Sequence, residues 1–231
     1  MDTNKRTGRI VALLFILMIV SGSVSLNLRG LSGSLAESEN FLQHVFENAT
    51  DMKVSVLLSL VAGTFWIGIA ALVFPAIRQR KNSLVMWYFA LGFLILQFAI
   101  SSFGDISRLS LISLSEESVK EGGSEADHFK ILGILYWKEY LWAHFLALIG
   151  FAIGAGAFYF SLYQARLIPL ILSAWGIVAV TIVFVVTWLQ IFDIKVSFAF
   201  YIQNGVFMIF LVLWLLVKGF NPARVDSEIE N

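Results

Sequence analysis

Residues 139–163, "EYLWAHFLALIGFAIGAGAFYFSLY", form an apolar run that is long enough to cross a lipid bilayer. A membrane-spanning helix needs about 20 mainly apolar residues. With about 100° between successive residues, the small side chains of this run fall on one narrow seam: Ala143, Ala147, Gly150, Gly154 and Ala157. Small residues at this spacing allow two membrane helices to approach closely. The run therefore predicts a membrane-spanning helix that packs tightly against a neighbouring helix.

The composition extends this prediction to the whole chain. Of the 231 residues, 58% are hydrophobic and only 14% are charged, whereas soluble domains are about half apolar and a quarter charged. The excess apolar surface must therefore face lipid. Five further stretches are long enough to span, at about 10–28, 54–77, 84–104, 168–190 and 196–218. We expect an all-α, single-domain bundle of six transmembrane helices in the lipid bilayer.

Charge and cysteine content exclude several classes of function. The formal net charge is zero, which argues against nucleic acid as a partner. The chain has no cysteine, so disulfides, iron–sulfur clusters and thiolate zinc sites are excluded. The sequence predicts no cofactor.

The distribution of basic residues predicts the orientation in the membrane. Nine of the 16 basic residues lie at the two ends of the chain and in the turns after the second and fourth stretches. Because Lys and Arg are enriched in cytoplasmic loops, both termini are predicted to be cytoplasmic, with residues 219–231 as a polar tail. The first stretch follows Lys5, Arg6 and Arg9 and also fits a cleaved signal peptide; the two alternatives stay open.

Two outer segments have helical patterns of their own. In residues 36–51, one helical side carries Phe41, Leu42, Val45 and Phe46. This pattern predicts a short amphipathic helix on the outer membrane surface. Residues 124–137 begin with a capping-box-like start and are predicted to continue into the fourth spanning helix.

Polar residues gather at the outer ends of the third and fourth spans. In the third span, Ala90, Gln97, Ser101, Gly104 and Arg108 share one face. In the fourth, Glu139 lies on the small-residue seam, while Lys138 and Trp142 lie on the far side as an interfacial pair. An ion pair between Arg108 and Glu139 is expected, with Asp105 competing for the same guanidinium.

Together, the polar residues of the outer half predict an outward-opening pocket for a small anionic ligand or a lipid headgroup. Its ligand-binding residues would be Gln97, Asp105, Arg108, Glu139, His144, Gln203 and Asn204, with Asp193 at the rim. Arg108 would hold the anion, and the amides would form the floor because unpaired buried amides are costly in lipid. The simpler interpretation is that these groups only pair helices.

Two other functions stay open. A membrane-embedded metal-dependent hydrolase would need His44, Glu47 and His144 to converge with Glu139, although the sequence has no HExxH, GxSxG or P-loop motif. A non-catalytic partner subunit or scaffold would use the polar residues only to join helices. Whether the chain forms a homo-oligomer or binds a membrane partner is also open.

Three stretches carry a resemblance to a known family. They are "RIVALLFILMIVSGSV" (9–24), "FYFSLYQARLIPLILSAWGIVAV" (158–180) and "LWLLVKGFNP" (213–222). Their pattern of a basic residue followed by Ile-Pro, Leu-Ser and Trp-Gly resembles a bacterial family of small polytopic membrane proteins known only as a domain of unknown function (family forty-three eighty-six). The resemblance implies a six-helix bundle in the bacterial cytoplasmic membrane and implies no activity.

Overall fold

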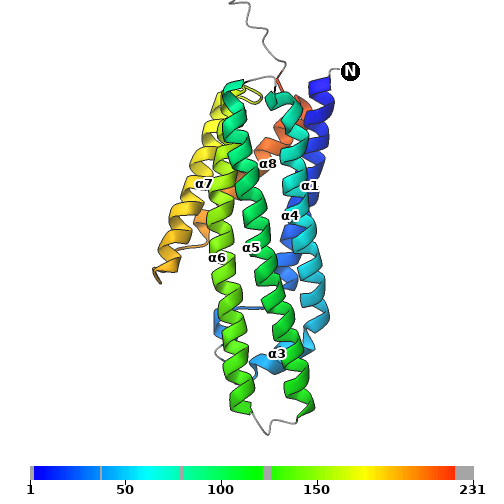
Figure 1. Cartoon of the computed structure of the whole chain (residues 1–231), viewed down its shortest axis with the longest axis vertical. Coiled ribbons are helices and arrows are strands. Elements are labelled where there is room, and N and C mark those ends of the chain that lie inside the picture. Colours follow the sequence, from blue (N-terminus) through cyan, green and yellow to red (C-terminus); the bar gives the residue numbers. More distant parts are fainter. Residues whose placement is uncertain (1–2, 37, 79–80, 122–125, 222–231) are drawn as a thin grey trace, which may run out of the picture. The chain divides into compact units, whose positions relative to one another are not determined.

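The computed structural model describes residues 3–36, 38–78, 81–121 and 126–221. These residues form helices joined by turns (Figure 1): α1 (Thr3–Leu28), α2 (Gly33–Ala36), α3 (Phe41–Glu47), α4 (Ala49–Arg78), α5 (Lys81–Lys120), α6 (Ala126–Gln164), α7 (Leu170–Ile191) and α8 (Ala199–Val217). Six of them, α1 and α4 to α8, are long and apolar enough to cross a membrane. The all-helical architecture with six spanning helices is confirmed, and the chain is a multi-pass membrane protein.

The helices are organised in two compact units. The α7–α8 unit consists of Met1–Ile16, Trp66–Leu94 and Phe151–Asn231, and the α3 unit consists of Leu17–Phe65 and Ile95–Gly150. Helices α1, α4, α5 and α6 contribute residues to both units.

Aromatic side chains fill the core of the α7–α8 unit. The ring of Trp66 lies 5.3 Å from that of Phe15 and 5.4 Å from that of Phe158, centroid to centroid. On α7, Gly176 makes room for Phe207 of α8, because a Cβ at Gly176 would lie 2.6 Å from the Phe207 Cζ. Rings at these separations contribute packing beyond their buried area, so they hold α1, α4, α6, α7 and α8 together.

The predicted seam of small residues on α6 packs against α5. All five seam residues are buried: Ala143, Ala147, Gly150, Gly154 and Ala157. In the α3 unit, a Cβ at Gly104 of α5 would lie 3.1 Å from the Ala143 Cβ, and a Cβ at Gly150 would lie 3.3 Å from the Gln97 Cβ. The two backbones therefore approach as closely as small residues allow, and the predicted packing seam is confirmed.

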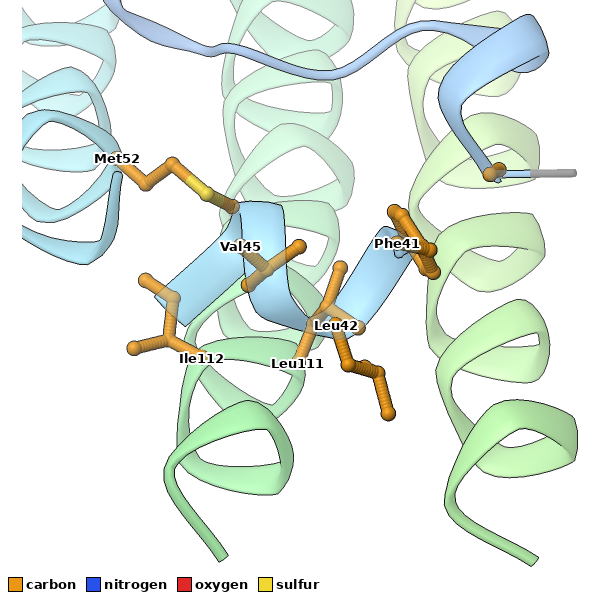
Figure 2. Close-up of a cluster of buried hydrophobic side chains, with 7 residues drawn as sticks. Phe41, Leu42, Val45, Met52, Leu111 and Ile112 are labelled. Carbon is orange, nitrogen blue, oxygen red and sulfur yellow. The ribbon is translucent and has the colours of Figure 1, made fainter. Parts of the chain in front are cut away.

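The short helix α3 has the predicted apolar face, but this face is covered by protein. Phe41 and Leu42 are 1% and 9% exposed, and they pack with Met52 of α4 and with Leu111 and Ile112 of α5 (Figure 2). The prediction that this side rests on the membrane surface was wrong for these residues. A buried aliphatic cluster offers the same apolar surroundings as lipid, and here α5 provides it.

Helices α5 and α6 are much longer than the predicted spans. They contain 40 and 39 residues, or about 60 Å each at 1.5 Å per residue, which is about twice the thickness of the hydrocarbon core. The predicted spans 84–104 and 139–163 are thus only parts of these helices. The expected continuation of the segment before residue 139 into the fourth span is confirmed from Ala126 onward.

The two ends of the described chain pack within the α7–α8 unit. Val11, Ala12 and Phe15 of α1 are buried, and whether this helix is retained or cleaved stays a prediction. The segment predicted as a polar tail begins with packed residues, because Phe220 is 4% exposed and the Asn221 N–H donates to the Leu167 carbonyl at 2.8 Å. The rest of the predicted tail, residues 222–231, lies outside the described residues.

Candidate functional site

Arg108 is the most deeply buried charged side chain among the described residues, at 2% exposed. It lies on α5, just beyond the predicted end of the third span. Its guanidinium forms an ion pair with Asp105, one helical turn earlier, and its Nη1 donates to the Ser55 Oγ at 2.9 Å. A buried charge is costly unless it is paired and hydrogen-bonded, and Asp105 and Ser55 supply both.

Ser55 connects this pair to α1. The Ser25 Oγ donates to the Ser55 carbonyl at 2.8 Å, and the Ser55 Oγ donates to the Ser25 carbonyl at 2.8 Å. Both serines are buried. Their small side chains allow α1 and α4 to approach, and their hydroxyls find partners across the contact. Arg108 is therefore the centre of a polar network that joins α1, α4 and α5.

The ring of Tyr140 on α6 lies beside two guanidinium groups. The Cζ atoms of Arg29 and Arg108 are each 5.3 Å from its centroid, within the range of cation–π attraction. Tyr140 is 6% exposed, and Arg29, which follows α1, is half-buried. We call Arg29, Arg108 and Tyr140 the arginine–tyrosine cluster.

The arginine–tyrosine cluster contains hydrogen-bonding groups without partners. The Nε atoms of Arg29 and Arg108 are buried without a partner, and the buried Tyr140 hydroxyl has no acceptor for its hydrogen. The Asp105 Oδ2 is also buried without a hydrogen-bond partner. Because buried polar groups are almost always paired, three unpaired donors around one ring need an explanation. Guanidinium and hydroxyl donors form strong hydrogen bonds with an oxyanion, so the arginine–tyrosine cluster is suited to one.

The structure places four of the predicted site residues around Tyr140. Asp105, and not Glu139, pairs with Arg108, because a carboxylate one turn away on the same helix is already in reach. Glu139 instead accepts a hydrogen bond from the Ser107 Oγ at 3.3 Å. The half-buried His144 stacks on Tyr140 with ring centroids 6.1 Å apart.

The predicted amide floor divides between the two units. Gln97 belongs to the α3 unit and packs against Gly150. Gln203 and Asn204 belong to the α7–α8 unit, where the Gln203 Nε2 donates to the Ala179 carbonyl at 2.8 Å and the Asn204 Oδ1 is buried without a partner. The floor as one layer stays a prediction.

Three more predicted residues are exposed: Asp193, Lys138 and Trp142. Asp193, the expected rim residue, lies exposed in the turn after α7 of the α7–α8 unit, with a φ of 59°. Lys138 and Trp142 are both exposed, as expected for an interfacial pair.

The residues named for a metal site have separate partners. The His44 Nε2 lies 3.3 Å from the Gly30 carbonyl, and Glu47 accepts a hydrogen bond from Gln43 at 2.8 Å. Within the described ranges, no group of three or more His, Cys, Asp or Glu residues is placed to hold a metal ion. The geometry therefore gives no support to the hydrolase alternative.

Sequence reasoning missed Arg29, Tyr140, Ser25 and Ser55. Arg29 marks the end of an apolar run, where a basic residue usually signals only an interface. Tyr140 follows Glu139 by one residue and is easily taken for part of an aromatic belt. The available signal was the pair of serines inside two apolar runs, since buried hydroxyls in a membrane need partners.

Comparison with protein families gives a match over most of the chain. The family model described as "Domain of unknown function (DUF4386)" matches residues 10–219. Comparison with curated proteins and with solved structures gives no match. The matched range includes α4 to α8, α1 from Ile10 onward and the arginine–tyrosine cluster. The chain therefore belongs to the DUF4386 family of proteins.

Proposed function

We propose that this membrane protein binds the anionic group of a small molecule or a lipid headgroup at the arginine–tyrosine cluster. The observation that supports the proposal best is the set of three buried, unpaired donors on Arg29, Arg108 and Tyr140. An oxyanion accepts charge-assisted hydrogen bonds from such donors. Polar and charged residues in membrane proteins often mark ligand pathways.

Each member of the cluster has a distinct role in this proposal. Asp105 and Ser55 hold Arg108 in place, so Arg108 supplies a fixed charge and its free Nε. Arg29 lies in the turn after α1 and is the more exposed of the two arginines, so it would make the first contact with an incoming anion. The Tyr140 hydroxyl would donate a hydrogen bond to one anion oxygen.

The side of the membrane follows from charge. Nine of the 16 basic residues lie at the chain ends and in the turns after α4 and α6, which supports cytoplasmic termini and an outer-facing cluster. The bacterial cytoplasmic membrane, implied by the family resemblance, is the proposed location.

A conservative substitution tests the proposal. Tyr140→Phe removes only the unpaired hydroxyl, and Arg29→Gln removes one guanidinium; Lys138→Gln removes an exposed charge from the same helix as a control. Two probes are used. Binding of inorganic phosphate is measured by its effect on the melting temperature of the protein, and bound phosphatidylglycerol is counted by native mass spectrometry. We expect wild type and the control to bind one molecule of a probe at the cluster, and both cluster variants to lose that one molecule because its binding weakens at least about tenfold, a loss of about 1.4 kcal/mol.

The two probes distinguish the sources of the anion. A shift with inorganic phosphate indicates a soluble ligand, whereas retained phosphatidylglycerol indicates a headgroup. The proposal is wrong if wild type binds neither probe, or if the variants and the control bind equally well.

A scaffold function is the second candidate, and one specific observation favours it. Arg108 contacts Asp105 and Ser55, and Ser55 is hydrogen-bonded to Ser25, so these contacts join three helices within the protein. If joining helices is the whole function, Tyr140→Phe should leave all binding unchanged, and only the substitutions at Arg108, Asp105 and Ser55 should lower stability.

A further inference from the structure

A second charged surface lies in the α7–α8 unit, where the start of α1 crosses the end of α8. A Cβ at Gly8 would lie 2.6 Å from the Gly219 Cα, and a Cβ at Gly219 would lie 2.6 Å from the Lys5 Cα. Gly219 also has a φ of 73°, which favours glycine. Only glycines permit this backbone crossing, so the two chain ends are held together closely.

Hydrogen bonds add the turn between α6 and α7 to this crossing. The Arg9 Nε donates to the Leu216 carbonyl at 3.2 Å. The Asn221 Nδ2 donates to the Arg166 carbonyl at 3.1 Å, and the Asn221 N–H donates to the Leu167 carbonyl at 2.8 Å. Three segments that are far apart in the sequence therefore meet at one end of the unit.

This meeting gathers five basic residues, which we call the basic end: Lys5, Arg6, Arg9, Arg166 and Lys218. Four of them are exposed, and Lys5 is half-buried. The described residues of the three segments, 3–9, 164–169 and 217–221, contain no acidic residue. None of the five takes part in the ion pairs found among the described residues. The basic end is therefore a concentrated positive charge that the described part of the fold does not neutralise.

Exposed apolar side chains lie next to these charges on the same three helices. Ile10 of α1 is 41% exposed, Val217 of α8 is 64% exposed and Leu170 of α7 is 51% exposed. Each lies within four residues of a member of the basic end. Such a surface matches an anionic phospholipid. The basic residues can contact its headgroup, and the neighbouring apolar residues can contact its acyl chains.

We propose that the basic end binds the phosphate-bearing headgroups of anionic phospholipids. Juxtamembrane clusters of Lys and Arg are attracted to anionic leaflets, and basic surfaces between membrane helices bind such headgroups. The proposal is independent of the arginine–tyrosine cluster, because it concerns other residues in the other unit and a separate lipid contact.

The test uses the full chain and vesicles of two compositions, pure phosphatidylcholine and phosphatidylcholine with one-third phosphatidylglycerol. Arg6→Gln with Lys218→Gln removes two exposed charges of the basic end without touching its hydrogen bonds. Lys138→Gln with Lys195→Gln removes two exposed charges elsewhere as a matched control. The measurement is the competition of the two lipids for the purified protein, by native mass spectrometry and by exchange of fluorescent phosphatidylglycerol.

We expect wild type and the control to prefer phosphatidylglycerol. Each charge near the surface contributes about fivefold, so the basic-end variant should bind it about 25-fold more weakly at low salt, with an unchanged melting temperature. High salt should reduce the difference.

Two results would overturn the proposal. One is an equal loss in both double variants, which would indicate a general effect of charge. The other is a wild-type protein without preference for phosphatidylglycerol, as expected if Asp226, Glu228 and Glu230 of the C-terminal segment neutralised the basic end.

Discussion

Arg108 is the central charged residue in the polar interior of the α3 unit. Its neighbours stabilise its charge away from water. The ion pair with Asp105 and the hydrogen bond to Ser55 satisfy two of its nitrogens. In a low-dielectric environment, removing one partner of such a pair leaves the other charge uncompensated.

The first prediction concerns this pair. Arg108→Met should lower the free energy of unfolding by about 3–5 kcal/mol, because Asp105 would stay buried and unpaired. The double variant Arg108→Met with Asp105→Leu should recover most of this loss. Equilibrium unfolding of the two single variants and the double variant measures the coupling. Additive losses would show that the two side chains do not depend on one another.

At this scale, the sequence predicted the residue types better than the partners. Arg108 and Asp105 were expected at a polar site, but the expected partner of Arg108 was Glu139. Helical periodicity shows which residues share a face and cannot rank two carboxylates that both lie within reach. Arg29 could not be found at all, because its contact with Tyr140 joins positions that are distant in the sequence.

At the scale of elements, the best-predicted contact is the one between α5 and α6. The small-residue seam needs only helical periodicity, and every member is buried. The apolar side of α3 was also predicted, but the surface that it packs against was not. Amphipathicity shows that Phe41 and Leu42 avoid water, and it does not distinguish a lipid surface from the side of another helix.

The second prediction compares two glycines of α5. Gly104 faces the Ala143 Cβ at a distance that leaves no room for a branched side chain, whereas a Cβ at Gly92 would meet nothing within 4 Å. Gly104→Val should therefore destabilise the protein by about 1–3 kcal/mol more than Gly92→Val. Thermal unfolding in one detergent gives the comparison. Equal melting temperatures would mean that α5 and α6 do not pack at Gly104.

The third prediction concerns α3. Leu42→Ala should cost about 2–3 kcal/mol, because it leaves a cavity in the cluster with Leu111 and Ile112. Phe46→Ala, at a position that is 40% exposed, should cost much less. Proteolysis of the segment 30–48 gives a second readout, since a loosened α3 would be cut faster. The docking of α3 would be refuted by a larger effect at Phe46 than at Leu42.

At the scale of the whole molecule, hydropathy predicted the number of spanning helices and not their lengths. A window of about 20 apolar residues detects only the part of a helix that lipid covers. The third span was therefore predicted to end at residue 104. The helix continues to Lys120, and Leu111 and Ile112 of this continuation pack on α3. Apolar residues that pack on another helix are typical of helices outside lipid. We therefore expect the last part of α5 and the first part of α6 to stand outside the hydrocarbon core, on the side that the arginine–tyrosine cluster faces.

The absence of cysteine from the chain allows this arrangement to be tested with single introduced thiols. The measurement is labelling of Glu117→Cys and Lys218→Cys in intact cells with a membrane-impermeant maleimide, with the spanning position Leu96→Cys as a control. We predict labelling of Glu117→Cys from outside, labelling of Lys218→Cys only after permeabilisation, and little labelling of Leu96→Cys. Labelling of Lys218→Cys from outside, with Glu117→Cys protected, would contradict the orientation and the outward-facing binding site together.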